Sequence, residues 1–184
     1  MRAETLEVLR ESQRLGFLGA RPVEQAAEHA TAFATSLGPL ADGTRLIDLG
    51  SGGGLPGLVL ADLLPRFSIM LVDRRQKRTD FLQRAVRRLG HEHVRVREAD
   101  VAGVAHEVEV GIEPPFDVVT ARGFGPPDMT VRLAKRLITD AGTIVISEPP
   151  TGDRWNQALL AELGLGSERI GPVRVFHVKH STPT

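Results

Sequence analysis

The sequence predicts an α/β fold in which a mostly parallel sheet is covered by helices on both faces. From residue 45 onward, short stretches rich in Val, Ile and Leu alternate with longer stretches of helical periodicity. The second apolar stretch, SIMLVD, lacks polar alternation, which is typical of a strand buried on both faces. A glycine-rich turn, DLGSGGGLPG at residues 48–57, ends the first stretch. We therefore expect a helical cap at 1–40 and one α/β domain of about seven strands at 41–184.

The cap is expected to contain two helices. Residues 3–15 form the first, which ends at Gly16, and Pro22 opens the second. Gly38-Pro39 ends this second helix. Its apolar residues recur at helical spacing and should face the rest of the fold: Val23, Ala26, Ala27, Ala30, Phe33, Ala34 and Leu37.

Strands and helices then follow in alternation. Pro56 lies in the first turn of the first helix of this series, where proline is tolerated. Glycines end the helices that follow the second and fourth strands. Strands are expected at 45–49, 68–73, 93–97, 116–121 and 143–147, helices at 55–64, 76–90, 126–142 and 153–164, and a final hairpin at 167–171 and 173–180.

The composition is that of a packed globular protein. The chain has 184 residues, 41% of them hydrophobic and 25% charged, with a formal net charge of zero. No apolar run approaches the roughly 18 residues that a membrane span requires, and the N-terminus lacks a signal-peptide core. The absence of cysteine excludes disulfides, thiolate metal sites and cysteine nucleophiles. We expect a cytoplasmic monomer without a membrane partner.

Positive charge is concentrated between residues 74 and 97. Nine basic residues lie there, against the two acids Asp80 and Glu92. Such a surface attracts phosphate backbones, but it is equally consistent with a helix face whose counter-charges come from elsewhere in the fold. On a helical projection, Lys77, Arg84 and Arg88 form an outer stripe, whereas Arg78 lies within the apolar face. We expect Arg78 to have a partner, either a carboxylate or a phosphate at the cleft.

The glycine-rich turn predicts a cofactor site. Glycines let the backbone approach a ligand closely, and the helix that begins near Leu55 directs its N–H groups toward it. Asp73 ends the next strand, where a carboxylate can accept hydrogen bonds from both hydroxyls of a ribose. The stretch fits both GxGxxG and DxGxGxG, so a nicotinamide cofactor and S-adenosylmethionine are both candidates.

Three details favour S-adenosylmethionine. Asp48 ends the first strand, where a carboxylate repels a pyrophosphate but suits a cationic amino acid group. The segment Ala99-Asp100-Val101 follows the third strand and offers a polar side chain and an N–H to adenine. The chain also shows no separate substrate domain, which a dehydrogenase usually has.

DLGSGGGLPG, LVDRRQKRTDFL, VREADV and FDVVTAR together resemble the RsmG (GidB) family, class I (Rossmann-like) methyltransferases of small-subunit ribosomal RNA. The resemblance covers about residues 3–184 and is strongest from 45 to 122. It implies methylation of N7 of a guanine, with 16S RNA or the 30S subunit as partner. The resemblance places Arg122 at the mouth of the cleft, after the fourth strand. Together with the residues argued above, the expected cofactor-binding set is Asp48, Gly50, Ser51, Gly52, Gly54, Leu55, Asp73, Ala99 and Asp100. The expected RNA-binding set is Lys77, Arg78 and Arg122, and Arg122 is also the expected catalytic residue.

The chain departs from the family pattern at several positions. Ser147-Glu148 stands where the family typically has Lys-Gly, an acid in place of a base near the expected RNA entrance. Glu28-His29 and Thr35-Ser36 only approximate the family's Arg-His and Asp-Ser pairs, and the basic tail after the final threonine-proline is missing. Three alternatives therefore stay open: a paralogue with another acceptor, a non-catalytic S-adenosylmethionine-binding or RNA-binding protein, and a nicotinamide-dependent oxidoreductase.

The residue types fit methylation of a ring nitrogen. Guanine N7 carries a free lone pair, so the reaction requires alignment of the reacting atoms and no general base. Methylation of exocyclic amines or ring carbons needs a polar clamp such as Asn-Pro-Pro-Tyr or a cysteine, and this chain has neither. The six histidines do not show metal-ligand spacing, and Trp155 is expected to be a packing residue.

Overall fold

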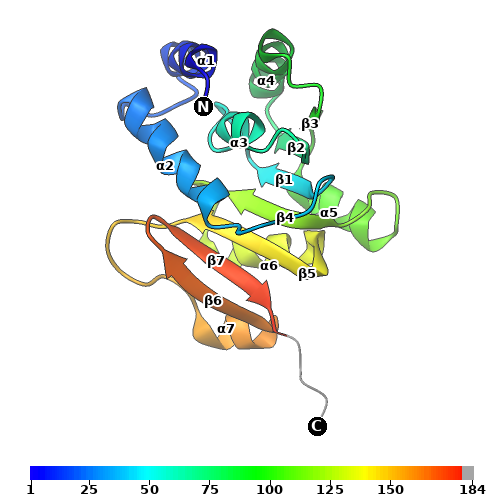
Figure 1. Ribbon diagram of the computed structural model, residues 1–184. Helices are drawn as coiled ribbons and strands as arrows, with labels where there is room; N and C mark the ends of the chain where they lie inside the picture. Colours follow the sequence, from blue (N-terminus) through cyan, green and yellow to red (C-terminus); the bar gives the residue numbers. More distant parts are fainter. Residues whose placement is uncertain (180–184) are drawn as a thin grey trace.

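The computed structural model describes residues 1–179 and contains a seven-stranded sheet in the order β3-β2-β1-β4-β5-β7-β6 (Figure 1). The first five strands run parallel, and the last two form an antiparallel hairpin at one edge. The expected mostly parallel, seven-stranded α/β fold is confirmed; His180 and the final threonine-proline lie outside the described residues. The strands are β1 (Arg45–Leu49), β2 (Ser68–Asp73), β3 (Val94–Glu98), β4 (Phe116–Ala121), β5 (Ile138–Ser147), β6 (Leu165–Ile170) and β7 (Val173–Val178).

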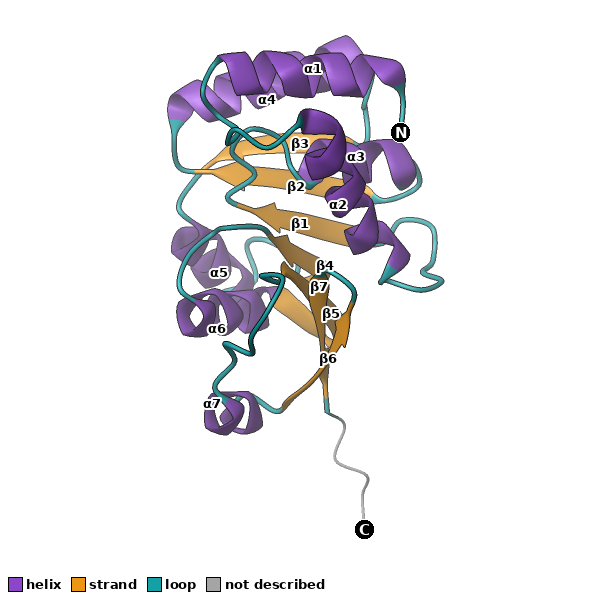
Figure 2. Cartoon of the chain, turned by 90° about the vertical axis from the view of Figure 1, so that its left-hand side faces the viewer, coloured by secondary structure: helices purple, strands orange, loops and turns teal. Residues whose placement is uncertain are grey.

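Helices cover both faces of the sheet in two separate layers (Figure 2). Helices α1 (Ala3–Arg14), α2 (Val23–Thr35), α3 (Gly57–Leu63) and α4 (Gln76–Leu89) contribute to one hydrophobic cluster. Helices α5 (Val101–Glu109), α6 (Pro127–Leu137) and α7 (Gln157–Glu162) contribute to the other. Because alternate strand residues point to opposite faces, neighbours such as Leu46 and Ile47 belong to different clusters.

The strand order reverses next to β1. The chain moves outward from β1 through β2 to β3, and then returns to place β4 on the other side of β1. The connecting helices change face at the same point, since α3 and α4 lie on one side and α5 and α6 on the other. Leu49 and Ala121 pair at the carboxyl ends of β1 and β4. Such a switch point leaves a crevice beyond the strand ends, where ligands bind in open α/β sheets.

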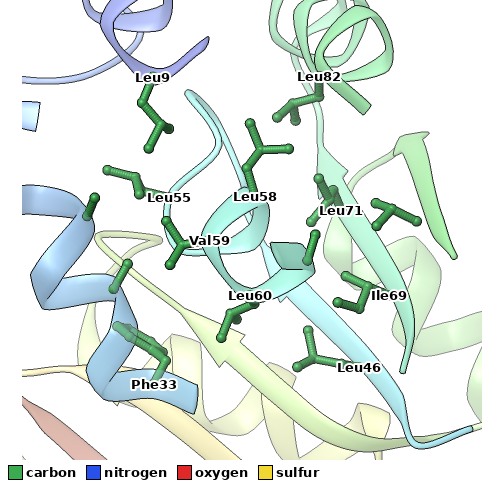
Figure 3. Close-up of a cluster of buried hydrophobic side chains, with 14 of the residues drawn as sticks. Leu9, Phe33, Leu46, Leu55, Leu58, Val59, Leu60, Ile69, Leu71 and Leu82 are labelled. Carbon is green, nitrogen blue, oxygen red and sulfur yellow. The ribbon is translucent and has the colours of Figure 1, made fainter. Parts of the chain in front are cut away.

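The two N-terminal helices share their core with the sheet. Leu9 of α1 and Phe33 of α2 belong to the cluster that also contains Leu58 of α3 and Leu71 of β2 (Figure 3). The side chain of Phe33 is completely buried. The predicted apolar stripe of the second helix is therefore the face through which α2 joins the core.

Some element boundaries differ from those predicted. The helix expected over 126–142 ends at Leu137, because Ile138 pairs with Phe116 and residues 138–142 belong to β5. Helix α3 begins at Gly57, with Pro56 as its N-cap residue. The predicted helix over 153–164 is only the shorter α7.

Helix α5 was not predicted from the sequence. Gly103 interrupts its periodicity, which lowers helix propensity. Asp100 caps its N-terminus by accepting a hydrogen bond from the N–H of Ala102, and Val104 and Ala105 are buried in the second hydrophobic cluster. Capping and burial together therefore outweigh the weak local propensity.

We expect Phe33→Ala to lower the free energy of unfolding by roughly 3–5 kcal/mol, because it leaves a cavity where α2 meets the sheet. Urea denaturation followed by circular dichroism measures the change. Leu40→Ala is a suitable control, since Leu40 is 39% exposed. A loss below about 1 kcal/mol for Phe33→Ala would show that α2 contributes little to the common core.

Candidate functional site

A cleft of about 340 Å³ lies at the carboxyl ends of the parallel strands. It brings together five of the predicted site residues from four segments: Gly50, Asp73, Arg78, Ala99 and Asp100. The other predicted residues, Asp48, Ser51, Gly52, Gly54, Leu55, Lys77 and Arg122, do not line the cleft itself. A larger hollow of about 680 Å³ lies at the opposite edge, where β1, β2 and β3 begin. We take the smaller cleft as the candidate site, because parallel sheets bind ligands at their carboxyl edge.

The glycine-rich turn is tightly packed from both sides. Gly50 and Gly52 have φ angles of 64° and 52°. A Cβ at Gly50 would lie 2.8 Å from the ring of Phe124, and one at Gly52 would lie 2.9 Å from Nη1 of Arg78. Ser51 is buried and turned inward, since its hydroxyl donates to the backbone oxygen of Asp48 at 2.9 Å. The turn therefore presents its backbone, rather than side chains, to the cleft.

Asp73 fixes the turn relative to β2. Its Oδ2 accepts a hydrogen bond from the N–H of Gly52 at 3.0 Å, and its Oδ1 accepts one from the N–H of Arg75 at 2.9 Å. Nη1 of Arg78 lies 3.7 Å from the same carboxylate, so the expected partner of Arg78 is a carboxylate. Each carboxylate oxygen can accept a further hydrogen bond, so Asp73 keeps acceptor capacity for a ligand.

Asp48 is a buried carboxylate with an unsatisfied oxygen. Its Oδ1 accepts a hydrogen bond from the hydroxyl of Thr120 at 2.8 Å, whereas its Oδ2 has no hydrogen-bond partner among the described residues. Burial raises the pKa of Asp48 to about 6, although the hydroxyls of Thr120 and Ser51, the nearby N–H of Gly57 and the charge of Arg122 oppose the shift. A cation near this carboxylate would offset the cost of its burial.

The segment after β3 forms the floor of the cleft. The N–H of Ala99 donates to the backbone oxygen of Asp73 at 3.1 Å, which joins the ends of β3 and β2. Oδ1 of Asp100 accepts from the N–H of Ala102 at 2.8 Å and so caps α5. Val101, the last residue of the predicted adenine segment, also lines the cleft.

The wall contributed by the loop after β4 was missed from the sequence. Phe124, Met129 and Leu133 line the cleft and make this side apolar. The signal for it was the segment GFGPP at residues 123–127, in which one aromatic residue stands among glycines and prolines directly after Arg122. Pro126 is the N-cap residue of α6, so this helix starts at the cleft.

Arg122 lies between the cap and the end of β4. It has no ion pair within residues 1–179, and burial lowers its pKa, with a further contribution from the charge of Arg21 and an opposing one from Asp48. Nε2 of His29 is buried without a hydrogen-bond partner in the described structure. Burial and the charges of Arg122 and Arg21 lower the pKa of His29. This junction is therefore electropositive and keeps His29 neutral near neutral pH.

Counter-charges from elsewhere in the fold account for part of the basic segment. Arg88 lies 3.3 Å from Glu7 and from Glu11 of α1, so one member of the predicted outer stripe is held by the cap. Arg95 and Arg97 are likewise paired with acids, at 2.7 Å and 2.5 Å. The exposed residues at the start of α4 have no ion pair within the described chain: Arg74, Arg75 and Lys77. Positive charge thus remains free beside the cleft.

Glu148, the acid expected near the RNA entrance, points into the protein. Its side chain is completely buried. The indole Nε1 of Trp155 donates to Oε1, and Nε of Arg174 lies 3.4 Å from the same oxygen. Trp155 packs edge-on against Phe176 at 4.7 Å between ring centroids, which confirms that it is a packing residue.

Residues 1–179 contain no group of three or more His, Cys, Asp or Glu side chains arranged to hold a metal ion. Within the same range, no helix combines the length and the apolar character that crossing a membrane requires.

Comparison with known proteins identifies the family. The family model described as rRNA small subunit methyltransferase G (GidB) matches residues 6–149. Ribosomal RNA small subunit methyltransferase G of Streptomyces coelicolor is 34% identical over 89% of this chain and 66% of its own length. Its counterpart in Sphingopyxis alaskensis is 42% identical over 73% of this chain and 51% of its own length. The chain thus spans about half to two thirds of the length of the relatives it matches.

Solved structures share the fold. A putative O-methyltransferase from Klebsiella pneumoniae superposes with a TM-score of 0.69 at 16% identity, over 98% of this chain and 91% of that one. Precorrin-6y C5,15-methyltransferase from Geobacter metallireducens superposes with a TM-score of 0.61 at 19% identity, over 90% of this chain and 95% of that one. The α/β architecture is therefore that of class I methyltransferases.

We expect Asp48→Asn to gain stability relative to the wild type as the pH rises from 4 to 7. The pKa of Asp48 is raised from 3.8 to about 6 on folding, so wild-type stability falls as the pH rises through this window. The difference between the two proteins in free energy of unfolding should change by about 2 kcal/mol in favour of the variant. Urea denaturation at both pH values measures it, and a difference that is independent of pH would contradict a buried carboxylate that ionises in this window.

Proposed function

Because the chain belongs to the rRNA small subunit methyltransferase G family, we propose that it transfers a methyl group from S-adenosylmethionine to N7 of a guanine in small-subunit ribosomal RNA. The observation that carries the proposal is the construction of the cleft. The backbone of Gly50 and the carboxylate of Asp73 line it at the switch point of the sheet, and the carboxylate of Asp48, the first residue of the glycine-rich turn, is buried at the end of β1. We expect a cytoplasmic monomer that acts on ribosomal RNA or the 30S subunit.

The residues of the cleft fit this cofactor. Asp73 has acceptor capacity left for the two ribose hydroxyls, and Gly50 lines the cleft without a side chain, so that a ligand can approach its backbone. The unsatisfied oxygen of Asp48 favours a cationic ligand over a pyrophosphate, which argues against a nicotinamide cofactor. Val101 and Asp100 lie where the adenine would be held, and Phe124 covers the opposite side. On these grounds we assign cofactor contacts to four residues of the predicted set, Gly50, Asp73, Ala99 and Asp100, and add Val101 and Phe124.

The chemistry requires alignment more than proton transfer. S-adenosylmethionine supplies a methyl group activated by its sulfonium charge, and N7 of guanine attacks it with a free lone pair. The protein must hold the two reacting atoms roughly 3 Å apart and exclude water. The apolar wall of Phe124, Met129 and Leu133 can exclude water from the cleft. We assign Arg122 to hold the RNA at the mouth of the cleft, as the family resemblance implies, and Lys77 and Arg78 to contact the RNA backbone.

Transfer of labelled methyl groups tests the proposed function. Suitable acceptors are 30S subunits and naked ribosomal RNA from a strain that lacks this protein, with a metabolite extract as a third sample. We expect label in the RNA, at sites that strand scission specific for N7-methylguanine detects. Label in metabolites alone would indicate a paralogue with another acceptor. Cofactor binding without transfer to any acceptor would indicate a binding protein.

We expect Asp73→Ala to weaken binding of S-adenosylhomocysteine by at least tenfold, since the variant loses charged hydrogen-bond acceptors in the cleft. Isothermal titration calorimetry measures the affinity. Asp80→Ala is the matched control, because it removes an exposed carboxylate from α4. Unchanged affinity in Asp73→Ala, or binding of NAD in place of S-adenosylhomocysteine by the wild type, would be inconsistent with the assigned site.

We expect Arg122→Ala to reduce methyl transfer by about 10²-fold while the affinity for S-adenosylhomocysteine stays within a fewfold of the wild type. The assay should be run above pH 7.5, because loss of the Arg122 charge raises the pKa of Asp48 further. Arg10→Ala serves as control, since Arg10 pairs with Glu24 on the exposed side of the cap. Equal losses of cofactor affinity and of transfer would place Arg122 in the cofactor site instead.

A further inference from the structure

The segment after β5, at the carboxyl edge of the sheet, is left unexplained by the proposed function. Glu148 is buried there with no opposite charge on its own strand, and its Oε2 has no hydrogen-bond partner among residues 1–179. Three groups from later in the chain surround it: the indole N–H of Trp155, Arg174 of β7, and Arg154, whose Nε lies 3.8 Å from Oε2. A buried carboxylate with this many partners stabilises one arrangement of the surrounding side chains.

The side chain that this arrangement orients is Arg154. Its guanidinium donates to the backbone oxygen of Ser147, the last residue of β5, and stacks on the ring of Trp155 at 5.0 Å from the centroid. The carboxylate of Glu148 accepts a hydrogen bond from the N–H of the same indole ring. Yet Arg154 is 34% exposed, whereas Arg174 is 12% exposed and Glu148 is completely buried. Of the charged groups in this cluster that contact Glu148, Arg154 is the one that faces solvent most.

Strand register places Arg122 and Ser147, the residue to which Arg154 is bonded, on adjacent strands. Ala121 of β4 pairs with Ile146 of β5, and the two strands are parallel. Arg122 and Ser147 therefore follow this pair at the same level of the carboxyl edge. Since Arg154 is bonded to Ser147, cations stand at the ends of two adjacent strands.

Arginines of β6 and β7 hold the loop that carries Arg154 in place. Arg169 of β6 donates to the backbone oxygens of Pro149 and Pro150, at 2.7 Å and 3.1 Å. Arg174 also lies 3.4 Å from Oδ1 of Asp153, next to Arg154 in the sequence. A guanidinium on a loop fixed at several points loses little side-chain freedom when it binds an anion, which favours binding.

We propose that Arg154, positioned by the buried Glu148–Trp155–Arg174 cluster, binds a backbone phosphate of the substrate RNA next to Arg122. The inference rests on the proposed function, because it assigns a phosphate contact for that substrate. Glu148 is then a positioning residue that acts through Trp155 and Arg154. The acid at the end of β5 does not repel the RNA, since its charge is turned inward and is opposed by two arginines.

The test is binding of 16S ribosomal RNA at several KCl concentrations, together with methyl transfer to the same RNA. We expect Arg154→Ala to weaken RNA binding about tenfold and to lower the slope of log K against log salt by about one, as for loss of one phosphate contact. The KM for RNA should rise with kcat largely kept, and the affinity for S-adenosylhomocysteine should not change. Arg132→Ala is the matched control, because it removes an exposed arginine paired with Glu162 on the outer side of α6.

The variant Glu148→Gln distinguishes a carboxylate that positions Arg154 from a carboxylate that repels the RNA. The amide can still accept from Trp155 but loses the charge that attracts Arg154 and Arg174, so we expect RNA binding to weaken severalfold. If Glu148 instead faced the RNA, removal of its charge would make this variant bind RNA more tightly. Tighter binding would therefore overturn the proposal. Trp155→Phe keeps an aromatic face under Arg154 but removes the donor to Glu148; it should also weaken RNA binding, and it replaces Glu148→Gln if that variant does not fold.

The two proposals fail in different ways. If the wild type methylates RNA but Arg154→Ala has wild-type affinity and salt slope, the phosphate contact is wrong and the proposed function stands. If the wild type binds S-adenosylhomocysteine but methylates no RNA, the proposed function fails and this inference fails with it.

Discussion

The contact between β1 and β4 at the centre of the sheet is the constraint on which the site depends. These strands are neighbours because the chain returns past β1 after β3, and the connecting helices change face at the same place. Asp48 at the end of β1 and Thr120 at the end of β4 are joined there by a buried hydrogen bond. Two features next to the cleft follow directly from this pair in the chain: the glycines of the turn follow Asp48, and Arg122 follows Thr120 by two residues.

The cleft has a cost in stability that the surrounding core must offset. Asp48 keeps one buried oxygen without a hydrogen bond, and the turn that follows it needs positive φ at several glycines. Features of this kind persist only where the rest of the structure over-determines them, and they cluster at functional sites. The hydrophobic cluster that unites α1 and α2 with the sheet supplies this support on the side of the turn, where Leu55 and Leu58 are buried (Figure 3).

Most of the fold was predictable because its signals are local. Apolar runs marked the five parallel strands, and the glycine-rich turn and Asp73 marked the cleft. The end of α6 was not predictable, since Ile138 continues the helical pattern and becomes a strand only by pairing with Phe116. Phe124 was missed for a similar reason: its role as a wall follows from its contact with Gly50, which is distant in sequence. Both failed predictions concern residues whose structure depends on a contact with a residue in another part of the fold.

Charged residues show the same dependence on distant partners. The sequence left open whether the basic segment after β2 is a phosphate-binding surface or a solvated helix face, and the structure divides it. Arg88 is neutralised by α1, whereas Arg75 and Lys77 stay free beside the cleft. Glu148 is an acid at the carboxyl edge of the sheet, and its charge is balanced by Arg154 and Arg174 within the protein. Although the net charge is zero, cations without an ion pair in the described chain, among them Arg75 and Lys77, lie beside the cleft, so RNA would be attracted to the edge of the sheet where the methyl donor is proposed to bind.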